Sequence, residues 1–233
     1  MAVIALIIYT LTTLEFADTL FYEGDYFNAI TEYKRAIYLG ENKEHALYRI
    51  GLSYEKRKKF SLAAKYFGEL AFLSGKKDVE YHLAYNLIKT GKYREASLVL
   101  EGNEDTLSQI MWAVSKGLSG HFRKADSTLT LLNINVPSLP SDHLIRYPSY
   151  IIPGFGLFIL GDIKRGFLSL FFTTTTGYLT YYLLKHKRYP EAIVTFNTLF
   201  LRFYAGNIET AFMLKRKKKK DFYNSLLRKY TNF

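Results

Sequence analysis

The residues that could do chemistry in this chain are few and are poorly spaced for it. The 233 residues include no cysteine, which excludes thiol catalysis, disulfides and thiolate metal sites. Ser141, Asp142 and His143 are adjacent, whereas a catalytic triad is assembled from residues that lie apart in sequence. We expect Ser141 or Asp142 to cap a short helix after Pro140 instead. The five histidines are scattered singly, without the His-Glu-x-x-His spacing of a zinc site: His45, His82, His121, His143 and His186.

A glycine-rich segment contains Gly154, Gly156 and Gly161. It lacks the Gly-Lys-Ser/Thr sequence of a phosphate-binding loop and has no acidic residue at dinucleotide-binding spacing. We therefore expect these glycines to let an apolar hairpin turn and pack closely. The sequence predicts no enzyme, no metal site and no cofactor, and no small-molecule substrate is inferred from it.

The elements that would position any functional side chain are repeated. Four times in the first 130 residues, a Gly or Lys is followed two residues later by an aromatic and five residues later by an alanine. The alanines are Ala29, Ala63, Ala96 and Ala125, spaced by 34, 33 and 29 residues. This is the period of a helix-turn-helix solenoid, in which each unit buries its apolar stripe against its neighbours.

The residues around these alanines carry a family resemblance. The small and aromatic positions are Gly24, Tyr26, Tyr33, Ala36, Gly51, Tyr54, Phe60, Phe67, Ala84, Gly91, Tyr93, Ala113, Gly120 and Phe122. In these positions residues 10–130 resemble the tetratricopeptide repeat family. The resemblance implies an all-α solenoid of three to four helical hairpins that binds a protein or peptide.

In that family the concave face, formed by the first helix of each unit, holds the partner. Aligning the units on Gly51 and Ala84 puts six residues there: Tyr48, Leu52, Glu55, Tyr81, Tyr85 and Lys89. Tyrosine rings suit peptide capture, but they could equally fill the groove of the solenoid itself. Chaperone-binding members place Lys and Asn where Tyr48, Leu52, Tyr81 and Tyr85 stand, so a carboxylate-clamp partner is disfavoured.

Composition divides the chain. Residues 1–130 carry 17 basic and 16 acidic side chains, whereas residues 131–233 carry 15 and 5. We assign 17–130 to the repeat domain and 131–150, with Pro137, Pro140 and Pro148, to a linker. Residues 151–214 are assigned to a membrane-embedded helical region, and 215–233 to a basic tail.

The membrane assignment rests on two apolar stretches. Residues 167–184 contain no charge and are just long enough to cross a bilayer core of about 30 Å. Residues 192–214 are interrupted by Arg202 and Glu209, which makes a second crossing marginal. The predicted fold is therefore an all-α, tetratricopeptide-like solenoid followed by a membrane-associated helical hairpin.

The same region resembles bacterial envelope proteins that place a Pro-Gly-x-Gly element before a pair of membrane helices. The matching residues are Pro153, Gly154, Gly156, Gly161, Arg202, Gly206 and Asn207. Leu157 and Ile159 stand where that group has Gln and Tyr. The resemblance implies an architecture and a place in the cell envelope, without a known activity.

A basic run follows the second apolar stretch, consisting of Lys215, Arg216, Lys217, Lys218, Lys219 and Lys220. Such a run can bind nucleic acid, but beside an apolar helix we expect it to contact anionic lipid headgroups. Membrane lipid is thus a predicted partner, and nucleic acid is not.

Residues 1–16 have two interpretations. Residues 2–14 are apolar like the core of an export signal, although no basic residue precedes them, and residues 4–22 also suit the first helix of the first repeat. We favour the export signal and expect the repeats in the periplasm, although the distribution of positive charge favours the cytoplasm. We expect a membrane-anchored scaffold that presents the repeat groove in the bacterial cell envelope. The alternative is an accessory of membrane-protein assembly or transport whose hairpin is the active part.

Overall fold

The computed structural model describes residues 12–231, which form two compact units. Unit 1 contains the described residues up to Asn135, together with those from Leu226 onward. Unit 2 is Val136–Ser225. The described residues are helical with no strand, which agrees with the predicted all-α fold. The division falls inside the segment assigned to the linker.

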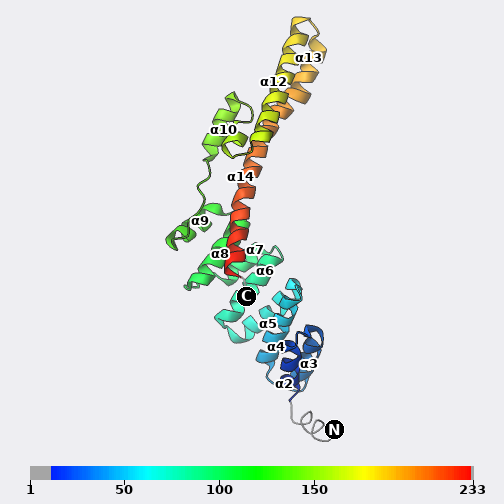
Figure 1. The fold of residues 1–233 in the computed structure, drawn as a ribbon, viewed down its shortest axis with the longest axis vertical. Helices are drawn as coiled ribbons and strands as arrows, with labels where there is room; N and C mark the ends of the chain where they lie inside the picture. The colour runs from blue at the N-terminus through cyan, green and yellow to red at the C-terminus, as the bar shows by residue number, and fades with distance from the viewer. Residues whose placement is uncertain (1–11, 232–233) are drawn as a thin grey trace. The chain divides into compact units, whose positions relative to one another are not determined.

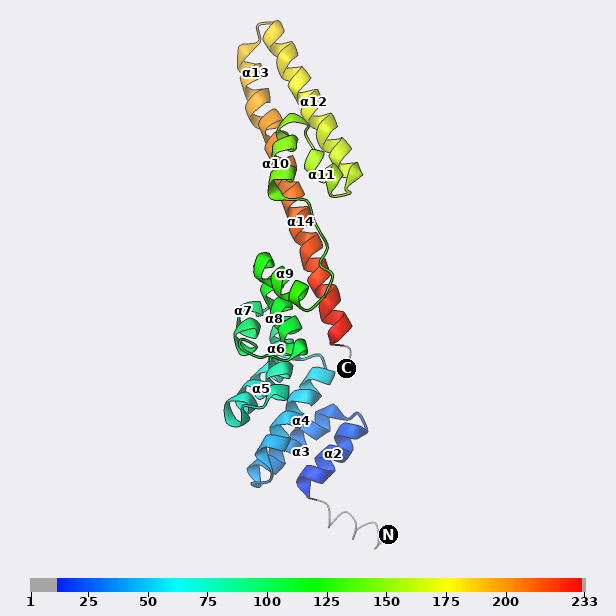
Figure 2. The same cartoon turned by 90° about the vertical axis from the view of Figure 1, so that its left-hand side faces the viewer.

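Unit 1 contains four antiparallel helix pairs in chain order (Figures 1 and 2). The pairs are α2 (Thr13–Tyr22) with α3 (Tyr26–Tyr38), α4 (Lys43–Lys56) with α5 (Phe60–Ser74), α6 (Lys77–Lys89) with α7 (Tyr93–Val99), and α8 (Thr106–Leu118) with α9 (Phe122–Leu131). Side chains of Thr12, Asp25, Asn42 and Asp105 cap four of these helices by accepting a backbone N–H from the first turn. The predicted first helix of the first repeat is thus present as α2, while most of the predicted export signal lies outside the described residues.

The turns inside the pairs explain the Gly-or-Lys pattern. Gly24, Gly91 and Gly120 have φ values of 85°, 80° and 96°, a region that only glycine adopts easily. The second pair has Lys58 at this place, with φ of 58°. A left-handed conformation is unfavourable for a residue with a Cβ, so Lys58 is a strained position in the turn between α4 and α5.

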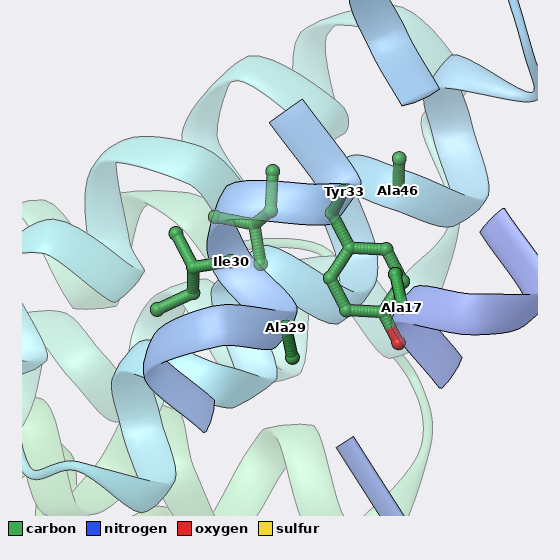
Figure 3. Packing of buried hydrophobic residues seen from close by; sticks show 6 residues of the cluster. Ala17, Ala29, Ile30, Tyr33 and Ala46 are labelled. Atoms are coloured by element: carbon green, nitrogen blue, oxygen red, sulfur yellow. The ribbon is translucent and has the colours of Figure 1, made fainter. Parts of the chain in front are cut away.

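The four alanines of the repeat pattern lie at helix crossings and are fully buried. Figure 3 shows the first crossing, where Ala17 of α2 lies against the ring of Tyr33 of α3, in the same buried cluster as Ala29. Gly51 of α4 likewise allows close packing against α5, because a Cβ at this position would lie 2.7 Å from the ring of Phe67. Small residues therefore set the approach of neighbouring helices, as the resemblance implied.

Unit 2 begins with α10 (Asp142–Ile151), whose first turn is capped by Ser141 as predicted. The remaining helices are α11 (Phe155–Ile159), α12 (Ile163–Lys185), α13 (Tyr189–Thr195), the π-helix η1 (Phe196–Phe200) and α14 (Leu201–Tyr230), of which the last residues belong to unit 1. In both views α12 lies beside α13 (Figures 1 and 2).

Two of the predicted glycines of unit 2, Gly154 and Gly156, sit where chain segments approach closely, whereas a Cβ on Gly161 would have its nearest contact at 3.9 Å. Gly154 has φ of 88°, and a Cβ there would lie 2.5 Å from the carbonyl oxygen of Gly166. A Cβ on Gly156 would meet Ile145, Ala211 and the Ser149 hydroxyl within 3.0 Å. These glycines let α10, α11 and α14 form one small core around Ile145 and Leu157.

The predicted membrane crossing is not supported. Within residues 12–231, none of the helices combines the length and the mean hydropathy that a bilayer crossing requires. Helix α12 is long enough at 23 residues, but the stretch 167–184 includes five threonines and three tyrosines. Their hydroxyl groups lower the mean hydropathy of the helix. The prediction of a membrane crossing rested on length and on the absence of charged residues, and it therefore overestimated the hydropathy.

Candidate functional site

The candidate site in unit 1 is a cleft of about 430 Å³ at the N-terminal ends of α4 and α6. Its lining consists of Asn42, Glu44, His45, Tyr48, Leu70, Lys76, Asp78 and Val79. These ends come together because the caps of α4 and α6 are at equivalent places in successive repeats. Glu44 and Lys76 form an exposed ion pair at 2.9 Å across the cleft. Asp78 has no hydrogen bond or ion pair within the described residues.

Of the six predicted groove residues, Tyr48 is the one that lines this cleft. Its ring meets Phe67 and His82 edge-on, with centroids 5.9 Å and 5.7 Å away. Leu52 packs instead against the apolar core of the second and third repeats. Glu55 lies further along α4 and is largely enclosed by residues of α6.

The predicted residues of α6 behave differently from one another. Tyr81 is only 8% exposed, and its hydroxyl donates to the backbone oxygen of Tyr230, 3.3 Å away within unit 1. Tyr85 meets Phe60 edge-on and lies under the Nζ of Lys89, at 5.2 Å from its ring centroid. For Tyr81 the structure therefore favours the alternative interpretation, a ring that fills the solenoid.

Burial keeps the tyrosine hydroxyls protonated. Burial raises the pKa of Tyr48, and the carboxylates of Asp78 and Glu55 raise it further. The pKa of Tyr85 is raised by burial and then by Glu55. Both side chains therefore remain neutral hydrogen-bond donors at physiological pH.

A polar network that the sequence analysis missed joins α2 to α4. The carboxylate of Asp18 accepts from the Tyr33 hydroxyl, from Nε2 of His45 at 3.0 Å and from Nε of Arg49 at 3.2 Å. Arg49 also donates to the Tyr22 hydroxyl at 2.6 Å. Because a carboxylate only accepts, each of these contacts has the correct polarity.

A second network joins α4 to α6 in the same way. Glu55 accepts from Nδ1 of His82 at 3.2 Å and from Nδ2 of Asn86 at 2.7 Å. Each of these three residues follows its counterpart in the first network (Asp18, His45 and Arg49) by 37 residues. That offset is four residues, or one helical turn, longer than the spacing from Ala63 to Ala96. A search at 37 residues would have found the network from the sequence.

Some of the predicted hairpin residues of unit 2 shape the backbone around α11, and the others line a cleft. Pro153, Gly154 and Gly161 form the turns before and after α11, and Gly156 lies buried inside this helix. Arg202, Gly206 and Asn207 line a second cleft, together with Glu209. In the basic run, Lys215 forms an ion pair with Asp142 at 2.7 Å, and Lys219 is buried. The other four members of the run are exposed: Arg216, Lys217, Lys218 and Lys220.

In the part of the chain that the structure describes, no three His, Asp or Glu side chains are grouped so that they could hold a metal ion. No curated protein shows a significant match to the chain. Residues 45–71, which span α4 and most of α5, match the family described as tetratricopeptide repeat. This match and the stacked helix pairs of unit 1 support a tetratricopeptide repeat protein.

Proposed function

We propose that the protein is an interaction scaffold whose unit 1 binds a peptide in the cleft between α4 and α6. The observation that carries this proposal is the cleft itself, which lies on first helices of successive repeats and combines an aromatic, an aliphatic and a charged wall. Tetratricopeptide repeats generally mediate binding of proteins or peptides, and the matched residues 45–71 include His45, Tyr48 and Leu70 of the cleft.

The charges of the cleft define the peptide. Asp78 offers an unpaired carboxylate, while Lys76 is already neutralised by Glu44. Beside Asp78, the ring of Tyr48 provides the apolar surface, while its hydroxyl is hydrogen-bonded to Nε2 of His82 at 3.3 Å, and Leu70 and Val79 border the cleft with only 2% of their surface exposed. A Lys or Arg next to an apolar side chain fits this arrangement, and the acidic networks nearby disfavour a peptide that ends in a carboxylate.

Selection from a displayed random-peptide library against the full chain tests this proposal. We expect enrichment of basic–apolar pairs, and about tenfold weaker binding of the selected peptides to Asp78→Asn, since a hydrogen bond to a charged group contributes about 1.5–3 kcal/mol. Glu101→Gln removes an exposed carboxylate away from the cleft and is the matched control. Enrichment of acidic peptides, or equal binding to both variants, would refute the proposed cleft.

We further propose that unit 2 holds the scaffold at a membrane surface of the bacterial cell envelope. Large apolar side chains of α12 are exposed, among them Phe167, Phe171 and Leu184, with 61%, 61% and 46% of their surface accessible. Basic side chains precede and follow this stretch, at Lys164 and Lys185. Together they favour an apolar surface that rests in a lipid interface while its ends contact anionic headgroups.

Flotation of the full chain with phosphatidylglycerol vesicles tests the membrane proposal. We expect co-flotation that is lost when Phe167 and Phe171 are both replaced by Ser, and that persists in Tyr22→Ser, which removes an exposed ring from unit 1. Flotation that is equally strong for all three proteins, or absent for the unmodified chain, would exclude unit 2 as the membrane contact.

A further inference from the structure

The second cleft, between α12 and α14 of unit 2, is open to solvent and extends to the backbone. Its volume is about 610 Å³, within the range of about 300–1,000 Å³ typical of small-molecule sites. Gly206 forms part of the floor, because a Cβ there would meet no atom within 4 Å. The π-helix η1 ends at Phe200, two residues before Arg202 of α14. Turns of π-helix are frequent at functional sites.

The walls of this cleft are mainly apolar. Leu157, Leu168, Phe172 and Phe203 contribute to them, and the rings of Phe172 and Phe203 stack with centroids 5.2 Å apart. Two polar side chains among them are incompletely satisfied. The Ser169 hydroxyl and Oδ1 of Asn207 are buried and form no hydrogen bond within residues 12–231. Unpaired buried polar atoms are unfavourable, which suggests that a ligand supplies partners.

The charges are distributed along the cleft. Gly177 faces Phe200 and Phe172 stacks on Phe203, so α12 and the start of α14 run antiparallel. Arg165 therefore lies toward the Glu209 end, and its Nε is already bound to Asp162 at 3.2 Å. Arg202 lies toward the opposite end and has no ion pair or hydrogen bond within the described residues. It is the uncompensated cation of the cleft.

We infer that this cleft binds one amphipathic anion. Its carboxylate or phosphate group contacts the guanidinium of Arg202, which is well suited to both because of its planar pair of donors. Its hydrocarbon chain lies between Phe172 and Leu168 and extends over Gly206 toward Leu157. The same chemistry is found in a free long-chain fatty acid and in a single lipid with a phosphate headgroup. The inference is independent of the peptide cleft in unit 1.

Calorimetric titration of the purified full chain with monomeric palmitate, hexadecyl phosphate and hexadecanol tests the inference. We expect saturable binding of at least one of the two anions and about tenfold weaker binding of the neutral alcohol, because the alcohol lacks the charge that Arg202 binds. Preference for palmitate would indicate a fatty acid, and preference for the phosphate a lipid headgroup. Equal binding of all three compounds, or binding of none, would overturn the inference.

Two pairs of variants distinguish the cleft from general adsorption. Arg202→Gln is expected to weaken binding of the anion about tenfold, whereas Lys124→Gln, which removes an exposed charge of α9 in unit 1, is expected to leave it unchanged. Gly206→Leu is expected to abolish binding by filling the floor, whereas Gly206→Ala fills little of it. Circular dichroism verifies that each variant is folded. Equal effects of Arg202→Gln and Lys124→Gln, or unchanged binding to folded Gly206→Leu, would contradict the assignment.

Discussion

Units 1 and 2 differ in how many of their buried polar atoms are paired. In unit 1, the carboxylates of Asp18 and Glu55 each gather several donors from neighbouring helices, and the alanines at the crossings are fully buried. In unit 2, Ser169, Thr173 and Asn207 keep unpaired buried atoms, while the phenylalanines of α12 are exposed. Among the described residues, unit 1 leaves one buried side-chain atom unpaired, Oδ1 of Asn86, against three in unit 2, so most of the polar groups that a ligand could complete lie in unit 2.

Asp18→Asn should have the largest effect on unit 1. The substitution weakens charge-assisted hydrogen bonds from His45 and Arg49 and leaves these part-buried donors poorly satisfied, so we expect a loss of about 1–3 kcal/mol in the free energy of unfolding. Denaturant unfolding measures it. Glu95→Gln, which breaks an exposed pair with Lys92, should change stability by less than about 0.5 kcal/mol. Equal losses would mean that the network contributes no more than a surface pair.

Gly51→Ala tests the close approach of α4 and α5. The new Cβ would lie within 3.0 Å of the buried Phe67 ring, so we expect a loss of about 1–3 kcal/mol despite the better helix propensity of alanine. Gly68→Ala in α5 is the matched control, because its Cβ would meet the nearest atom at 3.9 Å. It should gain about 0.5–1 kcal/mol. Stabilisation by both substitutions would show that the crossing is not tightly packed.

The repeat pattern predicted these crossings because small residues were visible at a fixed period. Lys58 stands at the turn position that Gly occupies in the other three repeats. Those three glycines indicated a left-handed backbone at this position, and Lys58 adopts it as well. The networks of Asp18 and Glu55 were missed, because their 37-residue offset differs from the period of the alanines. The motif containing Arg202 and Asn207 was recognised, but its role as a cleft wall depends on pairing with α12, which sequence spacing does not specify.

Lys58→Gly should stabilise unit 1. Its φ of 58° is unfavourable for lysine and easy for glycine, so the gain is expected to be about 1 kcal/mol, reduced by the larger backbone entropy of glycine in the unfolded chain. Lys59→Gly, at a φ of −91°, should give no gain. Thermal unfolding of both variants measures the difference. A higher melting temperature for Lys59→Gly than for Lys58→Gly would show that the turn is not strained.

The smallest effect is expected for Asn207→Leu, and it sharpens the comparison of the two units most directly. Asn207 and Asn86 are both buried with an unpaired Oδ1, but Nδ2 of Asn86 binds Glu55 at 2.7 Å, whereas Nδ2 of Asn207 reaches only the Phe203 oxygen at 3.4 Å. Leucine has a similar volume, so Asn207→Leu removes an unsatisfied group at little loss and should change stability by less than about 0.5 kcal/mol. Asn86→Leu deprives a part-buried carboxylate of a donor and should lose about 1–3 kcal/mol. Denaturant unfolding of the ligand-free chain, followed separately for each unit, measures both. A loss of stability in Asn207→Leu as large as that in Asn86→Leu would show that the amide of Asn207 is needed by unit 2 itself, and that its unpaired oxygen does not mark a site for a ligand.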